Sequence, residues 1–115
     1  HHDDKYNDIY SRFSLHAMTE VEEIAALEAA YNLLEDDGNL YIECRSINDP
    51  LARKGEVIST TERIDGHYRR FVDLVILEKR LKSIGFSILE TIESRGLAVF
   101  NDEDPVVIRV IAKRI

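Results

Sequence analysis

The chain has 115 residues, of which 44% are hydrophobic and 32% are charged, and its formal net charge is −7. This length accommodates one small domain and excludes two full hydrophobic cores. No apolar run approaches the roughly 20 residues that span a bilayer, so we expect no membrane insertion. The single cysteine, Cys44, excludes an internal disulfide and favours a reducing, cytoplasmic location. His1 and His2 resemble the remnant of a purification tag and are given no role.

Charge is distributed unevenly along the chain. Residues 1–44 carry eleven acidic and two basic side chains, whereas residues 45–80 carry six acidic and eight basic ones. An acidic protein with one basic segment indicates a local anion site and argues against nucleic-acid binding. Ordinary scatter of surface charge explains the same pattern, so both interpretations stay open.

The first predicted elements are a short strand, a loop and a helix. The apolar pair Ile9–Tyr10 marks the end of a strand, and Ser11–His16 has no clear periodicity and is expected to be a loop. Thr19 and Glu22 form a capping-box pattern, in which the Thr19 hydroxyl accepts from the Glu22 amide while Glu22 reaches back to Thr19. Apolar residues at a spacing of three to four then predict an amphipathic helix.

The segment Asp36–Asn39 is expected to end this helix, with Gly38 in the left-handed conformation. A strand follows over Leu40–Cys44. Residues 45–66 are polar and lack sustained periodicity, and a stretch of that length inside a compact domain indicates a functional loop, a lid or an insertion.

Regular structure is predicted again from Phe71 onwards. Phe71–Ile84 has a helical pattern, which places Arg69 and Arg70 at its start. Two strands follow, over Phe86–Ile92 and Val106–Ile111, and they are close enough in sequence to pair antiparallel.

The predicted fold class is therefore α/β, with a sheet of three to four strands whose last two are antiparallel, and two main helices. Two helices cover only one face of such a sheet, whereas α/β sheets normally carry helices on both faces. The chain is thus expected to be a single domain over residues 1–115 that forms half of a doubly wound domain, or a unit that completes itself by dimerising through its open first strand.

Three segments are expected to converge on one site. Ligands of α/β sheets bind outside the carboxyl ends of strands, which selects the residues after the first and second strands and those at the end of the long loop. Histidine there can act as a general base, and arginine can hold a phosphate or carboxylate. The candidate catalytic residues are His16 and His67, and the candidate substrate-binding residues are Arg12, Arg45, Tyr68, Arg69 and Arg70.

Structural roles compete with several of these assignments. His16 can equally be a helix-entry residue, and Phe13 and Phe71 can be core anchors. Arg109, in an otherwise apolar strand, is expected to pair with Glu90 or Glu93 across the sheet. Cys44 is expected to be a small buried hydrophobe, and no spacing of His, Asp and Glu predicts a metal site.

Four segments together resemble the C-terminal half of a class I S-adenosylmethionine-dependent methyltransferase. Tyr6–Ala17 is similar to the fourth strand and following loop of that family, and Leu33–Glu43 to the helix, turn and strand that come next. Leu81–Phe86 resembles the entry to the sixth strand, and Pro105–Ala112 the antiparallel seventh. His67–Phe71, together with Arg12, Phe13 and His16, further resembles members that modify bacterial surface polysaccharides.

The resemblance implies a Rossmann-like sheet, S-adenosylmethionine as cofactor, and O-methylation of a small or sugar-type, anionic acceptor. It also implies that Ser11 and Phe13 contact the cofactor. The family's N-terminal half, with its glycine-rich loop, has no counterpart in this sequence. We therefore expect the chain alone neither to bind the cofactor tightly nor to transfer methyl groups.

A second hypothesis belongs to another class of protein. The chain can be a non-enzymatic α/β interaction module that forms a homodimer through its open sheet edge. In that case Arg45, Arg69 and Arg70 would bind an anionic partner.

Overall fold

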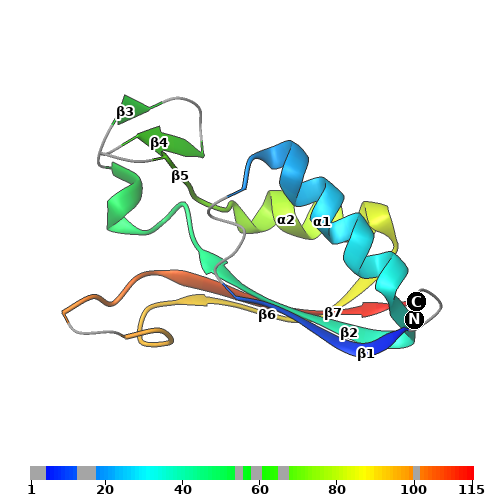
Figure 1. Ribbon diagram of the computed structural model, residues 1–115. Coiled ribbons are helices and arrows are strands. Elements are labelled where there is room, and N and C mark those ends of the chain that lie inside the picture. The colour runs from blue at the N-terminus through cyan, green and yellow to red at the C-terminus, as the bar shows by residue number, and fades with distance from the viewer. Residues whose placement is uncertain (1–4, 13–17, 54–55, 58–60, 65–67, 100–101) are drawn as a thin grey trace.

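The computed structural model describes residues 5–12, 18–53, 56–57, 61–64, 68–99 and 102–115 (Figure 1). Seven strands, two α-helices and one 3-10 helix occur in these residues. In chain order they are β1 (Tyr6–Arg12), α1 (Glu20–Leu33), β2 (Leu34–Arg45), η2 (Pro50–Arg53), β3 (Glu56–Val57), β4 (Glu62–Ile64), β5 (Tyr68–Arg70), α2 (Leu74–Ile84), β6 (Phe86–Ser94) and β7 (Val107–Arg114).

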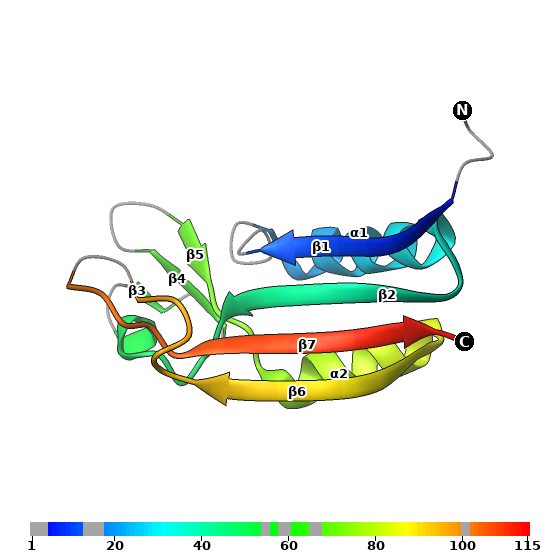
Figure 2. The same ribbon diagram turned by 90° about the horizontal axis from the view of Figure 1, so that it is seen from below.

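The main sheet has four strands in the order β1-β2-β7-β6. β1 pairs parallel with β2, while β7 lies antiparallel to both β2 and β6. Figure 2 shows β1, β2 and β6 running in one direction and β7 in the other. The predicted antiparallel pairing of the last two strands is confirmed, and β1 is an edge strand of the described sheet.

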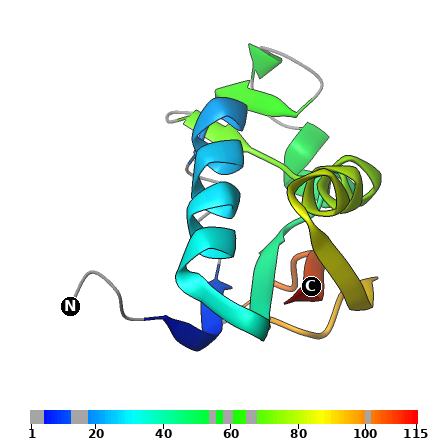
Figure 3. The ribbon, with the colours of Figure 1, turned by 90° about the vertical axis from the view of Figure 1, so that its right-hand side faces the viewer.

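Both helices lie on one face of the main sheet, α1 over β1 and β2 and α2 over β6 and β7 (Figures 1 and 3). Strand alternation sends Leu40, Ile42 and Cys44 of β2 towards the helices, where each is at most 2% exposed. They pack with Leu27 of α1 and Leu81 of α2 in one hydrophobic core. The prediction that Cys44 is buried is thus confirmed, and the loss of hydration raises the pKa of its thiol.

The opposite face of the main sheet carries no helix in the described part of the chain, as the view from below shows (Figure 2). Tyr10 of β1 stacks on Tyr41 of β2 there, with ring centroids 4.6 Å apart and an interplanar angle of 9°. Tyr10 remains 72% exposed. An α/β sheet is ordinarily covered by helices on both faces, and in the described residues this face lacks such a layer of helices.

The start of α1 confirms the capping box. The Glu22 amide donates to the Thr19 Oγ1 at 3.2 Å, and the Thr19 amide donates to the Glu22 Oε1 at 2.9 Å. The hydrogen bond from the Thr19 backbone, followed by that with the Thr19 side chain, lowers the pKa of the Glu22 carboxyl.

The turn after α1 differs from the prediction at Gly38. Asp37, with φ of 66°, takes the left-handed conformation instead of Gly38. Gly38 lies within β2, and a Cβ placed on it would approach Glu35 O to 2.9 Å, Leu34 Cδ2 to 3.0 Å and Asn7 O to 3.1 Å. Glycine is therefore required here for close approach of β1 and the turn, and not for its backbone angle.

The second helix begins later than expected. Asp73 is its N-cap, and its Oδ1 accepts from the amides of Val75 at 2.9 Å and Ile76 at 3.3 Å. Arg69 and Arg70 therefore lie in β5 and not in the first turn of α2, which corrects the prediction. Phe71 is 1% exposed, in keeping with its expected role as an anchor, whereas Phe13 lies outside the described residues.

Part of the predicted long loop is folded. The segment after β2 contains η2 and the strands β3 and β4, which join β5 in a small antiparallel sheet in the order β3-β4-β5. This small sheet lies beyond the carboxyl end of β2, on the side of the helices (Figure 1). The predicted loop after β1 also begins later, because Ser11 and Arg12 belong to β1.

Sheet order also corrects the predicted partner of Arg109. Arg109 stands opposite Glu43 on the neighbouring strand β2, and its Nε donates to Glu43, so the pair is not with Glu90 or Glu93.

Among the described residues, no helix is long and apolar enough to cross a membrane.

Candidate functional site

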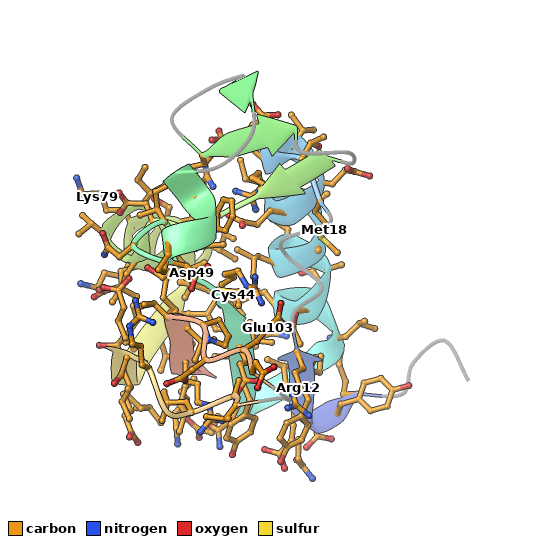
Figure 4. The ribbon with its side chains drawn as sticks, turned by 90° about the vertical axis from the view of Figure 1, so that its left-hand side faces the viewer. Arg12, Met18, Cys44, Asp49, Lys79 and Glu103 are labelled. Atoms are coloured by element: carbon orange, nitrogen blue, oxygen red, sulfur yellow. The ribbon has the colours of Figure 1, made fainter. Side chains whose placement is uncertain are left out.

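The carboxyl ends of β1, β2 and β6 meet at one edge of the main sheet, because these three strands run in the same direction. Arg12 ends β1, Arg45 ends β2, and Ser94 ends β6. Figure 4 looks onto this edge, with Arg12, Asp49 and Glu103 contributed by three different segments. In open α/β sheets this is the edge where ligands bind.

Side chains tie the exit of β2 to the end of β6. The Ser46 Oγ donates to the Glu93 Oε2, and the Asn48 Nδ2 donates to the same oxygen at 3.3 Å. The Asn48 amide donates to the Ser46 Oγ at 2.9 Å, a local bond that fixes the turn after β2. The edge is therefore built from ordered side chains on two neighbouring connections.

A second set of bonds joins the exit of β2 to the start of β7. The buried Asp49 carboxylate accepts from the Val106 amide at 2.8 Å, and its other oxygen lies 3.9 Å from Arg45 NH1. Arg95 NH1 donates to the Asp104 carbonyl at 3.3 Å, and the Gly96 amide donates to the Asp104 Oδ1 at 2.7 Å. The Val106–Asp49 bond holds the β6–β7 connection against the turn after β2, while the two bonds to Asp104 join the two ends of that connection to each other.

The two connections enclose a shallow cavity of about 200 Å³. Its wall carries two guanidinium groups, from Arg45 and Arg95, together with several carboxylates. Arginine presents a fork of donors suited to phosphate or carboxylate, while carboxylate oxygens accept from hydroxyl and amine groups. The arrangement thus offers both donors and acceptors to a polar molecule. The lining residues are Arg45, Asp49, Pro50, Arg95, Glu103, Asp104 and Pro105.

Several predicted site residues fall outside what the structure describes. His16, His67 and Phe13 lie outside the described residues. Tyr68 and Arg69 are described by their backbone alone, as members of β5. The predicted general bases and one cofactor contact therefore remain predictions.

The predicted arginines that are described each pair with a carboxylate. Arg12 Nε lies 2.9 Å from Glu43 on the face without helices, and the side chain is 73% exposed. Arg70 is 2% exposed and pairs with the fully buried Glu23, far from the cavity wall. Arg45 lines the cavity, and its NH1 lies 3.9 Å from the Asp49 carboxylate. Ser11 lies beside Arg12 at the end of β1, next to the free edge of the sheet.

Four charged residues that line the cavity, Asp49, Arg95, Glu103 and Asp104, were not among the site residues predicted from the sequence. The direction of β6 was the signal that could have indicated this part of the site. Both β2 and β6 pair antiparallel with β7, so β2 and β6 run in the same direction and end at the same edge of the sheet. Arg95 directly follows β6.

The face of the main sheet without helices has a groove of about 360 Å³. Aromatic, aliphatic and charged side chains line it, and Glu43 joins Arg12 and Arg109 in one ion-paired row across β1, β2 and β7. Arg109 NH2 also donates to the Leu97 carbonyl at 2.7 Å. The groove therefore combines an apolar floor with charges that are already paired.

The described residues line the carboxyl edge from one side and do not enclose a small-molecule site there. The cavity of about 200 Å³ at the carboxyl edge is smaller than the ~300–1,000 Å³ typical of small-molecule sites. On the free side of β1, where a further wall would stand, the described chain supplies no strand. The described residues also contain no cluster of three His, Cys, Asp or Glu side chains that could hold a metal ion.

The four-stranded mixed sheet with two helices is a partial methyltransferase fold, as comparison with solved structures shows. A putative S-adenosylmethionine-dependent methyltransferase from Listeria monocytogenes matches 97% of this chain and 62% of its own, with a TM-score of 0.73 and 16% identity. A methyltransferase from Methanosarcina mazei matches 98% and 61%, with a TM-score of 0.74 and 12% identity.

A glycopeptide N-methyltransferase in complex with S-adenosylmethionine is also similar, with a TM-score of 0.67, 13% identity, and coverage of 98% of this chain and 55% of its own. The chain thus spans about 60% of the length of the structures it matches. No family model and no curated protein matches the sequence. The expected fold class is confirmed, and the similarity shown is to the fold of S-adenosylmethionine-dependent methyltransferases.

Proposed function

We propose that this chain is the second half of an S-adenosylmethionine-dependent methyltransferase domain. The observation that carries the proposal is the strand order β1-β2-β7-β6, in which the reversed β7 is inserted between the parallel strands β2 and β6. Solved methyltransferases share this arrangement over 97–98% of the chain. By the resemblance, their additional length would correspond to the half that carries most cofactor contacts in the family.

The face of the sheet without helices supports this proposal. The crossover from β1 through α1 to β2 puts α1 on one face, and parallel crossovers are almost always right-handed. With the same handedness, helices cover the opposite face only when the strands that they connect are added on the outer side of β1. That topology is a doubly wound sheet whose switch point lies at the carboxyl end of β1, beside Ser11. The cofactor would bind at this point, when the second wall is present.

For the acceptor, we propose a small, sugar-type molecule with an anionic group, bound at the cavity between the exit of β2 and the β6–β7 connection. Arg45 and Arg95 would hold the anionic group, while Asp49 and Glu103 would accept from hydroxyl groups. Arg12 and Arg70 are poorer candidates than Arg45 because neither lines this cavity; their guanidinium groups pair with Glu43 and Glu23 elsewhere.

The proposed function is tested by reading the gene upstream of this segment and producing the chain together with what that region encodes. We expect a strand followed by a glycine-rich turn, and binding of S-adenosylhomocysteine by the assembled domain in isothermal titration. An upstream sequence without such a turn, or an assembled domain that does not bind the cofactor product, contradicts the proposal.

Titration of the assembled domain with sugar phosphates tests the acceptor separately. The Arg95→Met variant should weaken binding of the sugar phosphate and leave binding of S-adenosylhomocysteine unchanged. Equal affinity of variant and wild type for the sugar phosphate would remove Arg95 from the site.

A homodimer that pairs through β1 is the second candidate, and the exposed edge favours it. Tyr6 and Tyr10 on β1 are 54% and 72% exposed. An unpaired strand edge recruits another strand unless it is protected. Light scattering of the purified chain distinguishes the two: a dimer supports strand pairing, whereas a monomer supports the incomplete domain.

A further inference from the structure

A groove of about 630 Å³ separates α1 from α2, which lie side by side on the same face of the main sheet (Figure 3). Ile24 of α1 and Ile76 of α2 line it and remain 37% and 39% exposed. Tyr31 and Ile84, which pack against the hydrophobic core, extend the apolar lining. Apolar side chains gathered in one open groove indicate an interaction site, whereas single exposed apolar residues do not.

The two sides of this groove carry opposite charge. The charged residues of α1 are all acidic, whereas α2 has three basic residues and one acidic residue. Glu28 lines the groove from α1 and Lys79 from α2, and both are exposed. Neither forms an ion pair or a side-chain hydrogen bond with another residue that the structure describes. Arg80, by contrast, already pairs with Glu20 and Glu23. The groove therefore presents one uncompensated charge of each sign beside an apolar floor.

The shape of the groove fits a helix better than a small molecule. Ile24 and Asn32 lie eight residues apart on α1, so the lining extends over about 12 Å, or about two helical turns. A helix bound in such a groove inserts an apolar stripe whose residues recur every three to four positions. A small-molecule site needs polar groups that converge on an enclosed ligand, whereas Glu28 and Lys79 stand exposed on two different helices.

We propose that the groove between α1 and α2 binds an amphipathic helix of another protein. The apolar stripe of that helix would cover Ile24 and Ile76, a basic flank would meet Glu28, and an acidic flank would meet Lys79. The groove shares no lining residue with the cavity at the carboxyl edge. This interaction therefore goes beyond the proposed methyl transfer and does not depend on it.

Fluorescence anisotropy with two synthetic peptides tests the proposal. Both peptides are alanine-rich helices of about 20 residues with a leucine stripe. The mixed peptide carries lysine along one flank of the stripe and glutamate along the other, and the acidic peptide carries glutamate along both. The wild-type chain should bind the mixed peptide about 5–10-fold more tightly, because the acidic peptide places like charges beside Glu28. In Glu28→Lys this order should reverse, a result that damage to the fold cannot produce.

Matched variants separate the groove from the rest of the helix surface. Lys79→Glu should weaken binding of the mixed peptide by about 5–10-fold, whereas Lys82→Glu, an exposed residue of α2 outside the groove, should change it little. Ile24→Gln should weaken binding of both peptides. Its control is Val21→Gln, because Val21 is exposed on α1 but does not line the groove.

The proposal is overturned if neither peptide binds, if Glu28→Lys keeps the wild-type order, or if the variants outside the groove weaken binding as much as those within it. Self-association of the wild-type chain that Lys79→Glu abolishes would assign the groove to a second copy and would also overturn the proposal. The cofactor and the upstream segment take no part in these measurements. Failure here is therefore distinct from failure of the proposed function.

Discussion

Replacement of Gly38 by alanine should destabilise the chain because the new methyl group has no room. The added Cβ would lie 2.9 Å from Glu35 O, 3.0 Å from Leu34 Cδ2 and 3.1 Å from Asn7 O. Two of these atoms are backbone oxygens, so relief requires β1 and the turn after α1 to move apart. Overpacking of this kind costs about 1–3 kcal/mol, and alanine recovers about 0.4–1 kcal/mol by restricting the unfolded chain, which leaves a net loss of about 1–2 kcal/mol.

Thermal and urea unfolding of Gly38→Ala measure this loss. For a chain of this size, about 1–2 kcal/mol lowers Tm by about 4–10 °C. Gly96→Asn is the matched control, since Gly96 has φ of 82° and open space around its Cα. Asparagine tolerates that conformation, so Tm of the control should change little. The steric reasoning is refuted if Gly38→Ala is as stable as the wild type, or if Gly96→Asn loses as much stability.

Four further predictions concern other parts of the fold. Thr19→Ala should lower the free energy of unfolding by about 1 kcal/mol in urea titration, because α1 loses its cap. The pKa of Glu22 is lower in the folded state than in the unfolded state, so the ionised carboxylate stabilises the fold above the unfolded pKa of about 4.3. This stabilisation is lost as pH falls through the folded pKa. The free energy of unfolding of Glu22→Gln, measured in urea at several pH values, should therefore fall less steeply at acid pH than that of the wild type. Cys44 should resist a thiol reagent at neutral pH until the chain unfolds, since burial raises its pKa; rapid labelling of folded protein would contradict this. Arg114→Met should lower Tm, because Arg114 stabilises the end of α1. Its NH1 donates to the Tyr31 carbonyl, and its guanidinium lies 4.5 Å from the Tyr31 ring centroid. An unchanged Tm would refute this stabilising role.

The sequence predicted those features that local chemistry determines. The capping box at Thr19 and Glu22 involves residues three apart, so its pattern is readable without the fold. The reason for glycine at position 38, just after α1, was harder to predict from the sequence. The crowding there comes partly from Asn7, a residue of another strand. The start of α2 was misplaced because the apolar Phe71 continues the helical pattern, whereas the Asp73 side chain supplies the actual cap.

Contacts between distant segments could not be predicted in the same way. The pairing of Arg109 with Glu43 follows from β7 lying between β2 and β6, an order that a list of strands does not contain. Arg70 was expected to meet a bound anion or a carboxylate partner, and β5 places it against the carboxylate of Glu23, a partner 47 residues away that the sequence could not name. Arg45 was expected at the carboxyl edge and lies there, since the end of β2 alone determines its place. Its role in binding an acceptor remains a proposal.

Isothermal titration with S-adenosylhomocysteine tests the central claim, that this chain supplies one wall of a methyltransferase site. The chain alone should give no saturable heat, and the chain joined to the segment encoded upstream should give saturable binding of one equivalent. Tight binding by the chain alone, or no binding by the joined domain, would contradict the account.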